Sequence, residues 1–336
     1  MRIKLLIASR EADYSEHLSD YISKNHADVI AVSVCQSPER ISDLLRAQRF
    51  DAAVLEAPFA EGADLSRITL PLLLTTEDQD LPEALGRVKR ISKYQRISAL
   101  VADVVEQFAK VSTDARGSGQ ERAQITAVWS PAGGVGKTTV ALAYATKKHL
   151  EGKQALYLDL EPFSSVPAYF DESGKSISAA FEMLDNNEGN IKILIRGIRR
   201  QDSGGVSYFC HPDNFDDMNV LSVENVSALV SACAGVTDEL VVDMSCVCDD
   251  RTRQVFDLAD KVLLVVDQTS VAHFKLSQFT SQHDAFESIS EKTVLVANKD
   301  ATVSGQAVGA VAFLPLVPSA DPSVVYRALS SYSFGA

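Results

Sequence analysis

Two residues that can bind a nucleotide phosphate, Lys137 and Thr138, follow a short glycine-rich run. The glycines of this run are Gly133, Gly134 and Gly136. Glycines let backbone N–H groups turn toward an anion at the first turn of a helix. The ammonium group of Lys137 can reach the β- and γ-phosphates, and the Thr138 hydroxyl can bind Mg²⁺. The run therefore predicts a binding site for a nucleoside triphosphate with magnesium.

The flanking segments supply the elements that such a loop needs. Residues 125–129 are apolar and rich in β-branched side chains, which is typical of a strand. Residues 139–150 carry alanine and leucine at helical spacing. A strand, a glycine turn and a helix start form the context in which this motif binds phosphate.

Three carboxylates end two further apolar segments. Asp159 and Glu161 close the segment 155–160, and Asp243 closes the segment 239–243. Side chains two positions apart on a strand point to the same side, so Asp159 and Glu161 are expected to share one face. Ligands bind at the carboxyl ends of parallel strands in open α/β sheets. Asp159 and Glu161 are therefore expected to face a bound ligand, and Asp243 is a candidate to bind Mg²⁺ through water.

The run from Gly133 to Thr139 resembles the deviant Walker A box of the MinD/ParA ATPases. The resemblance implies ATP and Mg²⁺ as ligands, catalytic roles for Lys137, Asp159 and Glu161, and a metal site at Thr138, Asp159 and Asp243. Glu161 stands where the family has a second Asp, so its carboxylate is longer. The nucleotide contacts that the resemblance implies in the loop are Gly133, Gly134, Val135, Gly136, Lys137, Thr138 and Thr139.

Two residues near the end of the chain complete the implied site. Asn298 resembles the Asn that reads adenine in these ATPases, and an amide can bond both N6 and N7 of that base. The alternative for Asn298 is a plain turn, since Asn-Lys-Asp forms turns readily. Pro315 lies in a segment that resembles the strand and proline that pack near the base.

One position departs from the family in a way that affects hydrolysis. MinD/ParA ATPases carry a signature lysine just before the double glycine, and this chain has Ala132 there. In the family, two subunits enclose two ATP molecules and this lysine reaches the phosphates of the partner. The resemblance with Ala132 therefore implies a homodimer that ATP stabilises, with slow or absent hydrolysis.

The first 111 residues alternate apolar segments with helical ones, which predicts a parallel sheet. The pattern resembles a receiver domain of response regulators, a flavodoxin-like fold. Such domains place a phosphoacceptor Asp after the third strand, where this chain has Glu56. The acid pair that holds Mg²⁺ is reduced to Glu11, while Thr75 and Lys93 match the family. We expect that this region is not phosphorylated and that it binds a partner or dimerises. A receiver fold kept only for packing is the open alternative.

The order of segments predicts two α/β domains, a receiver-like one at 1–111 and a doubly wound P-loop ATP-binding one at 123–336. A polar linker is expected at 112–122. The net charge is −13, and residues 111–336 hold 28 acidic against 18 basic residues. This balance argues against a broad DNA-binding face and against attachment to anionic lipid. No apolar run spans a bilayer, and the apolar start is too short for a signal peptide, so a cytoplasmic protein is expected.

The pair Cys246 and Cys248 leaves two alternatives open. A metal or cluster site resembles that of the related nitrogenase iron protein. Free thiols fit better, because the spacing is not that of zinc ribbons and no His or further Cys stands nearby.

Receiver-like domain, linker and MinD/ParA-like ATPase resemble, in this order, the TadZ/CpaE family. The resemblance implies a factor that localises and assembles the tight-adherence (Flp) pilus secretion machinery, marks a cell pole, and has pilus or secretion proteins as partners. No nucleic acid and no direct membrane insertion are expected. Three other functions stay open: a cycling MinD/ParA positioning ATPase, a bacterial tyrosine kinase, and a scaffold without nucleotide. Tyrosine kinases of this type carry a C-terminal tyrosine cluster, and this chain has only Tyr326 and Tyr332 at its tail.

Overall fold

The computed structural model describes residues 2–61, 63–76, 82, 85–86, 88–112, 123–301 and 311–335. The chain forms two compact units. The first comprises Met1–Ser118 with Glu188–Ile198, and the second comprises Gly119–Asn187 with Arg199–Ala336. The expected linker at 112–122 lies outside the described residues, except for Ser112. Among the described residues, no helix is both long and apolar enough to cross a bilayer.

The first unit is built on a five-stranded parallel sheet with strand order β2-β1-β3-β4-β5. This is the order of flavodoxin-like folds. The last strand was not predicted, because Ile91 is its only apolar residue. The strands are β1 (Ile3–Ala8), β2 (Ile30–Cys35), β3 (Phe50–Leu55), β4 (Ile68–Thr75) and β5 (Lys89–Ser92).

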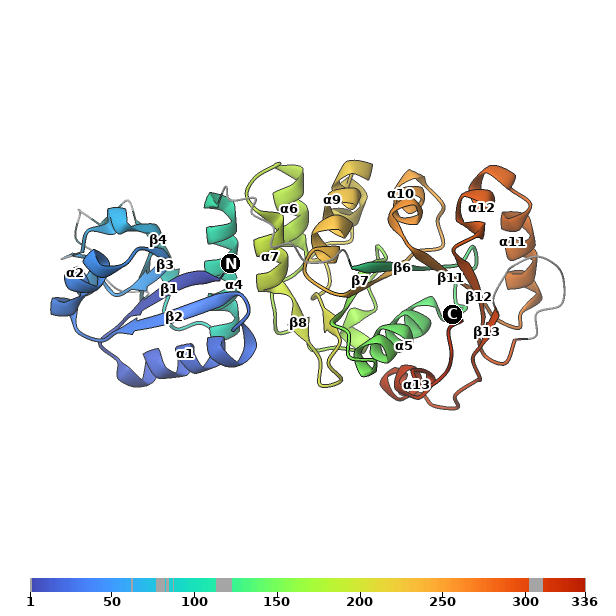
Figure 1. Ribbon diagram of the computed structural model, residues 1–336, viewed down its shortest axis with the longest axis horizontal. Helices are drawn as coiled ribbons and strands as arrows, with labels where there is room; N and C mark the ends of the chain where they lie inside the picture. The colour runs from blue at the N-terminus through green and yellow to red at the C-terminus, as the bar shows by residue number, and fades with distance from the viewer. Residues whose placement is uncertain are drawn as a thin grey trace. The chain divides into compact units, whose positions relative to one another are not determined.

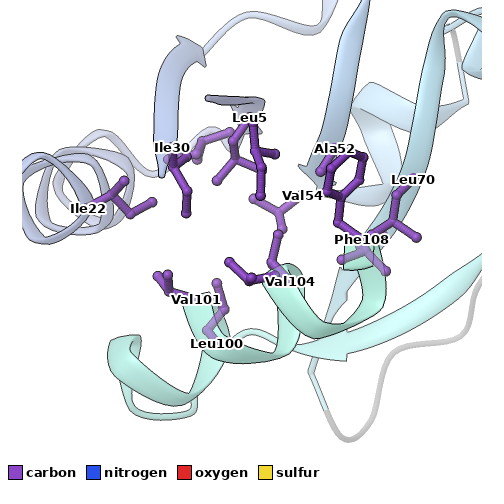
Figure 2. Close-up of a cluster of buried hydrophobic side chains, with 14 of the residues drawn as sticks. Leu5, Ile22, Ile30, Ala52, Val54, Leu70, Leu100, Val101, Val104 and Phe108 are labelled. Atoms are coloured by element: carbon purple, nitrogen blue, oxygen red, sulfur yellow. The ribbon is translucent and has the colours of Figure 1, made fainter. Parts of the chain in front are cut away.

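Helices cover both faces of this sheet, so the unit has two apolar cores. One core joins the sheet to α1 (Ala12–Asn25) and α4 (Ile97–Val111); Figure 2 shows Val101 and Val104 of α4 beside Leu5 and Val54 of the strands. The other core lies under α2 (Pro38–Ala47) and α3 (Ala57–Ala60). Helix α2 has Pro38 in its first turn, where a missing N–H costs nothing.

A helix from later in the sequence also belongs to the first unit. Helix α7 (Ile191–Ile198) packs on α4, and Ile193 joins the core that α4 covers. The two helices approach closely at Gly197, where an added Cβ would lie 2.1 Å from Cγ1 of Val105. Glycine is therefore required at this contact because any side chain would overlap with Val105.

The second unit is a doubly wound α/β domain on an eight-stranded sheet, with strand order β13-β12-β11-β6-β10-β7-β9-β8. All pairs are parallel except β8 with β9. The strands are β6 (Gln124–Trp129), β7 (Ala155–Leu160), β8 (Arg200–Gln201), β9 (Ser207–Tyr208), β10 (Glu239–Met244), β11 (Lys261–Val266), β12 (Thr293–Ala297) and β13 (Val311–Phe313).

Helices lie on both faces of this sheet. In Figure 1, α5 (Lys137–Leu150) and α13 (Pro322–Leu329) lie on one side, and α9 (Val223–Ala234), α10 (Asp250–Leu258) and α12 (His283–Ser290) lie on the other. The central strands are almost continuously apolar because both faces are covered. The remaining helices are α6 (Ser178–Asp185), α8 (Asp216–Val220) and α11 (Ser270–Thr280).

Candidate functional site

The phosphate loop connects the central strand β6 to the first residue of α5. Gly134 has a φ of 78° and Gly136 a φ of 94°, both in the left-handed region that side chains disfavour. Gly136 is the N-cap residue of α5, which begins at Lys137. Gly133 and Gly134 are exposed while Val135 is buried, so the loop is anchored at its apolar residue and open at its glycines. This is the form that a backbone anion site requires.

Lys137 is buried, with 7% of its side chain exposed. Its Nζ lies 3.2 Å from Oε1 of Glu161, which follows β7. The expected grouping of Lys137 with Glu161 is therefore present, but as a direct ion pair. Thr138 and Thr139, the next residues of α5, are both partly exposed.

Asp159 is fixed by two hydrogen bonds from its own loop. Its Oδ1 accepts from the N–H of Glu161 at 2.8 Å, and its Oδ2 accepts from the hydroxyl of Ser164 at 2.6 Å. The pKa of Asp159 is raised to about 6: burial is the largest cause, the two hydrogen bonds act against it, and the nearby Glu161 carboxylate adds to it. The protein thus holds a costly anion at this point, which a nearby cation would stabilise.

Asp243 is completely buried at the end of β10 and lies opposite Asp159 in the register of β10 with β7. Its Oδ2 accepts a hydrogen bond from the Tyr157 hydroxyl at 2.9 Å. Its Oδ1 has no hydrogen-bond partner in the described part of the chain. Burial first, and then the charges of Asp159 and Glu161, raise the pKa of Asp243 well above its ordinary value.

These residues fit a magnesium ion. An unpartnered, fully buried carboxylate oxygen on Asp243 is costly unless a ligand binds it. The described residues contain no group of three or more His, Cys, Asp or Glu side chains that could hold a metal by themselves. Mg²⁺ is usually held by one or two carboxylates, waters and substrate phosphates, so a complete protein cage is not needed. The Thr138 hydroxyl, which is close enough to lower the pKa of Asp243, would complete the protein's share.

Asn298 follows β12 and is buried against the phosphate loop. Its side-chain N–H donates to the Val135 carbonyl at 2.9 Å, and its Oδ1 has no partner among the described residues. The contact with adenine stays a prediction, for which Oδ1 is the free acceptor. Pro315 lies just past β13, beside the turn that holds Asn298, because the N–H of Asp300 donates to the Leu314 carbonyl.

Three contributing residues were missed in the sequence. Lys299 donates from Nζ to the Gly134 carbonyl at 2.8 Å, Tyr157 binds Asp243, and Ser164 binds Asp159. Tyr157 lies two positions before Asp159 on one strand, and this spacing could have placed its side chain on the same face. Nothing in the pattern around Lys299 predicts that its side chain turns back to the phosphate loop.

The Val247 carbonyl connects the segment after Asp243 to β6 and to α10. The Val247 carbonyl accepts from the Trp129 indole at 3.2 Å and from the Thr252 hydroxyl at 2.9 Å. Cys246 and Cys248 on either side form no disulfide, the first exposed and the second partly exposed. The preference for free thiols over a metal or cluster site stays a prediction.

In the first unit, Glu56 lies in an ion-pair cluster at the carboxyl ends of the strands. Its Oε1 lies 2.5 Å from Nζ of Lys93 and accepts from the Ser9 hydroxyl at 2.6 Å. Lys93 also pairs with Glu11 at 2.8 Å, and its N–H donates to the Thr75 carbonyl at 2.9 Å. Lys93 therefore contacts all three of the other residues singled out in the sequence: Glu11, Glu56 and Thr75. It forms ion pairs with both carboxylates.

Comparison with known proteins gives a structural likeness only. No family model matches the chain, and neither does any curated protein. A ParA family ATPase from Chlorobium tepidum is 16% identical, with a TM-score of 0.53, over 63% of this chain and 96% of its own. A plasmid partition protein of Borrelia burgdorferi bound to AMPPNP is 14% identical with a TM-score of 0.47, over 62% of this chain and 90% of its own.

A third solved structure, MinD of Pyrococcus horikoshii with Mg-ADP, is 12% identical with a TM-score of 0.46, over 62% of this chain and 94% of its own. The argument about the fold rests on the Chlorobium protein, whose TM-score exceeds 0.5. The chain therefore contains the doubly wound fold of ParA-type P-loop ATPases, with a phosphate loop, two aspartates and a lysine gathered at the carboxyl end of its central strands.

Proposed function

We propose that the second unit binds ATP with Mg²⁺ and acts as a nucleotide-controlled dimerisation switch. The observation that carries the proposal is the phosphate loop, whose left-handed glycines lead into buried Lys137 at the start of α5. The AMPPNP and Mg-ADP in the Borrelia and Pyrococcus structures agree with this choice of ligand.

Each residue of the site then has a distinct task. The loop amides and Lys137 hold the β- and γ-phosphates. Thr138, Asp159 and Asp243 hold the magnesium ion, which neutralises phosphate charge. Asp159 in β7 and Glu161 just after it, joined by a hydrogen bond, orient the attacking water in this proposal. Asn298 and Pro315 lie toward the base.

The direct test is calorimetry of the purified chain with millimolar ATP and magnesium, beside its Lys137→Ala variant. We expect binding by the parent and at least tenfold weaker binding by the variant, because Lys137 is the buried cation of the loop. A parent that gives neither heat nor a thermal shift leaves only the fold and supports the scaffold alternative.

We further propose that hydrolysis is slow, because Ala132 replaces the signature lysine of the family. The loss of a cation beside a transferring phosphoryl group costs about 10³–10⁵ in rate for an arginine finger. ATP turnover should therefore be near background in the parent and rise in the Ala132→Lys variant. A fast parent that the substitution does not accelerate would overturn this part and favour a cycling positioning ATPase.

At the level of the cell, we propose a dimeric factor that positions tight-adherence pilus components at a pole. The support is the order of the two units, together with a net charge of −13, which disfavours DNA and anionic lipid as supports. A fluorescent fusion should form polar foci that the Lys137→Ala variant loses. Pelleting with plasmid DNA or with anionic vesicles would instead identify a Min/Par-type cycle, and phosphotyrosine blotting a tyrosine kinase.

A further inference from the structure

Two carbonyl groups of the phosphate loop are each held by a side chain that follows β12. The Val135 carbonyl accepts from the Asn298 side chain at 2.9 Å, and the Gly134 carbonyl accepts from Nζ of Lys299 at 2.8 Å. Neither donor belongs to the loop or to α5. The loop is thus fixed from outside by a turn located more than 160 residues away in the sequence.

The geometry of the peptide bond gives these two contacts a consequence. In a planar trans peptide, the carbonyl of one residue and the N–H of the next point in opposite directions. A fixed Gly134 carbonyl therefore fixes the N–H of Val135, and a fixed Val135 carbonyl fixes the N–H of Gly136. With both carbonyls held from outside, both N–H groups are turned away from the donors, as an anion-binding nest requires.

The turn that carries the two donors is itself held in an unfavourable conformation. Lys299 has a φ of 58° and Asp300 a φ of 60°, and non-glycine residues in the left-handed region are uncommon. The N–H of Asp300 is bonded to the Leu314 carbonyl, and Asp267 lies 3.6 Å from Nζ of Lys299 on its other side. Such strain persists only where the surroundings enforce it, and it marks functional segments.

The close fit also explains the glycine at position 136. A Cβ on Gly136 would lie 2.5 Å from Nδ2 of Asn298, and the φ of 94° excludes a side chain independently. Asn298 is 3% exposed, so this contact belongs to the interior of the unit. Loop and turn therefore form one fitted structure.

We propose that Asn298 and Lys299 are positioning residues that orient the Val135 and Gly136 amides toward the phosphates of the nucleotide. This role rests on the proposed ATP binding and adds to it, because it assigns Asn298 a task at the phosphates and introduces Lys299. Lys299 also places a second ammonium group at the phosphate loop, in addition to that of Lys137. This loop lacks the family's signature lysine, because Ala132 stands at that position.

The test uses the full chain with Lys299→Met, which keeps the aliphatic stem and removes the donor, and with Lys299→Arg, which restores one. Lys275→Met, on the exposed side of α11, is the matched control. Two quantities are measured: the ATP dissociation constant in magnesium, and the hydrogen exchange of the Val135 and Gly136 amides in the nucleotide-free protein by NMR.

We expect Lys299→Met to weaken ATP binding about tenfold, as for the loss of one charge-assisted hydrogen bond, and to accelerate exchange at Val135. Lys299→Arg should recover most of the affinity, and Lys275→Met should match the parent. Asn298→Ala should accelerate exchange at Gly136. An Asn298 that only reads adenine would weaken ATP binding and leave this exchange unchanged.

Unchanged exchange at both amides, with melting temperatures equal to that of the parent, would overturn the inference. A parent that does not bind ATP would overturn the proposed function instead. The exchange measurement needs no nucleotide, so the two failures are distinguishable.

Discussion

Replacing Glu161 by glutamine should tighten the binding of ATP. Oε1 of Glu161 lies 3.2 Å from Nζ of Lys137, so the carboxylate and the phosphates compete for the same ammonium group. ATP therefore binds only the fraction of molecules in which this ion pair is open. Glutamine has nearly the same shape without the charge, so the substitution removes the competition with little change in packing.

The size of the effect follows from the geometry of the pair. At 3.2 Å the direct attraction is about 5 kcal/mol for an effective dielectric constant of 20. The Glu161 side chain is 24% exposed, and the cost of desolvation and ordering leaves a net value of about 1 kcal/mol. We therefore expect the ATP dissociation constant to fall about fivefold.

Calorimetry with ATP measures this, with and without magnesium, and Glu151→Gln serves as the control. Glu151 pairs with Lys147 and Lys148 on the exposed side of α5, so its loss should leave ATP binding unchanged. In the Ala132→Lys variant, whose hydrolysis is expected to rise above background, adding Glu161→Gln should slow single-turnover hydrolysis, since a carboxylate beside the attacking water is lost. Equal or weaker binding by Glu161→Gln in the absence of magnesium would refute the competition.

Three further substitutions test the contacts described above. Tyr157→Phe removes the hydrogen bond that Oδ2 of buried Asp243 accepts, and urea titration should show a free energy of unfolding lower by about 1–3 kcal/mol. Burial raises the pKa of Glu56, but its hydrogen bonds outweigh this and lower the pKa below 4.5, so its stabilisation is complete above pH 4.5 and is lost below it. The stability difference between the parent and Glu56→Gln should therefore shrink as pH falls, and a constant difference would contradict the assignment. Gly197→Ala should destabilise the first unit by about 1–3 kcal/mol, because its Cβ would lie 2.1 Å from Val105, and an unchanged melting curve would exclude that contact.

The strands and the phosphate loop could be predicted because local sequence determines them. Residues 261–266 and 293–297 are almost wholly apolar and form β11 and β12, and Gly136 with Lys137 fixes the start of α5. Strand β5 gave no such signal, since Lys89 and Arg90 are exposed and only Ile91 is buried. Its place in the sheet depends on pairing with β4, which is a long-range interaction.

The sequence predicts which residues belong to the site, but it does not predict which side chains contact one another there. Asp159 and Asp243 end apolar strands, a local pattern, and the sheet register then brings them opposite each other. Many charged side chains could have paired with Lys137, with the loop or with Glu56. The structure pairs Lys137 with Glu161, the Gly134 carbonyl with Lys299, and Glu56 with Lys93. Only the assembled fold decides which charges meet.

The membership of α7 in the first unit has a practical consequence for dividing this protein. The backbone passes from one unit to the other three times, at 118–119, 187–188 and 198–199, so a single cut cannot release two complete halves. A fragment ending at residue 111 would lack α7 and expose to water the apolar side of α4 around Val105, which invites self-association. Truncation studies of either half should therefore graft Glu188–Ile198 onto the amino-terminal fragment by a short linker and bridge the resulting gap in the other.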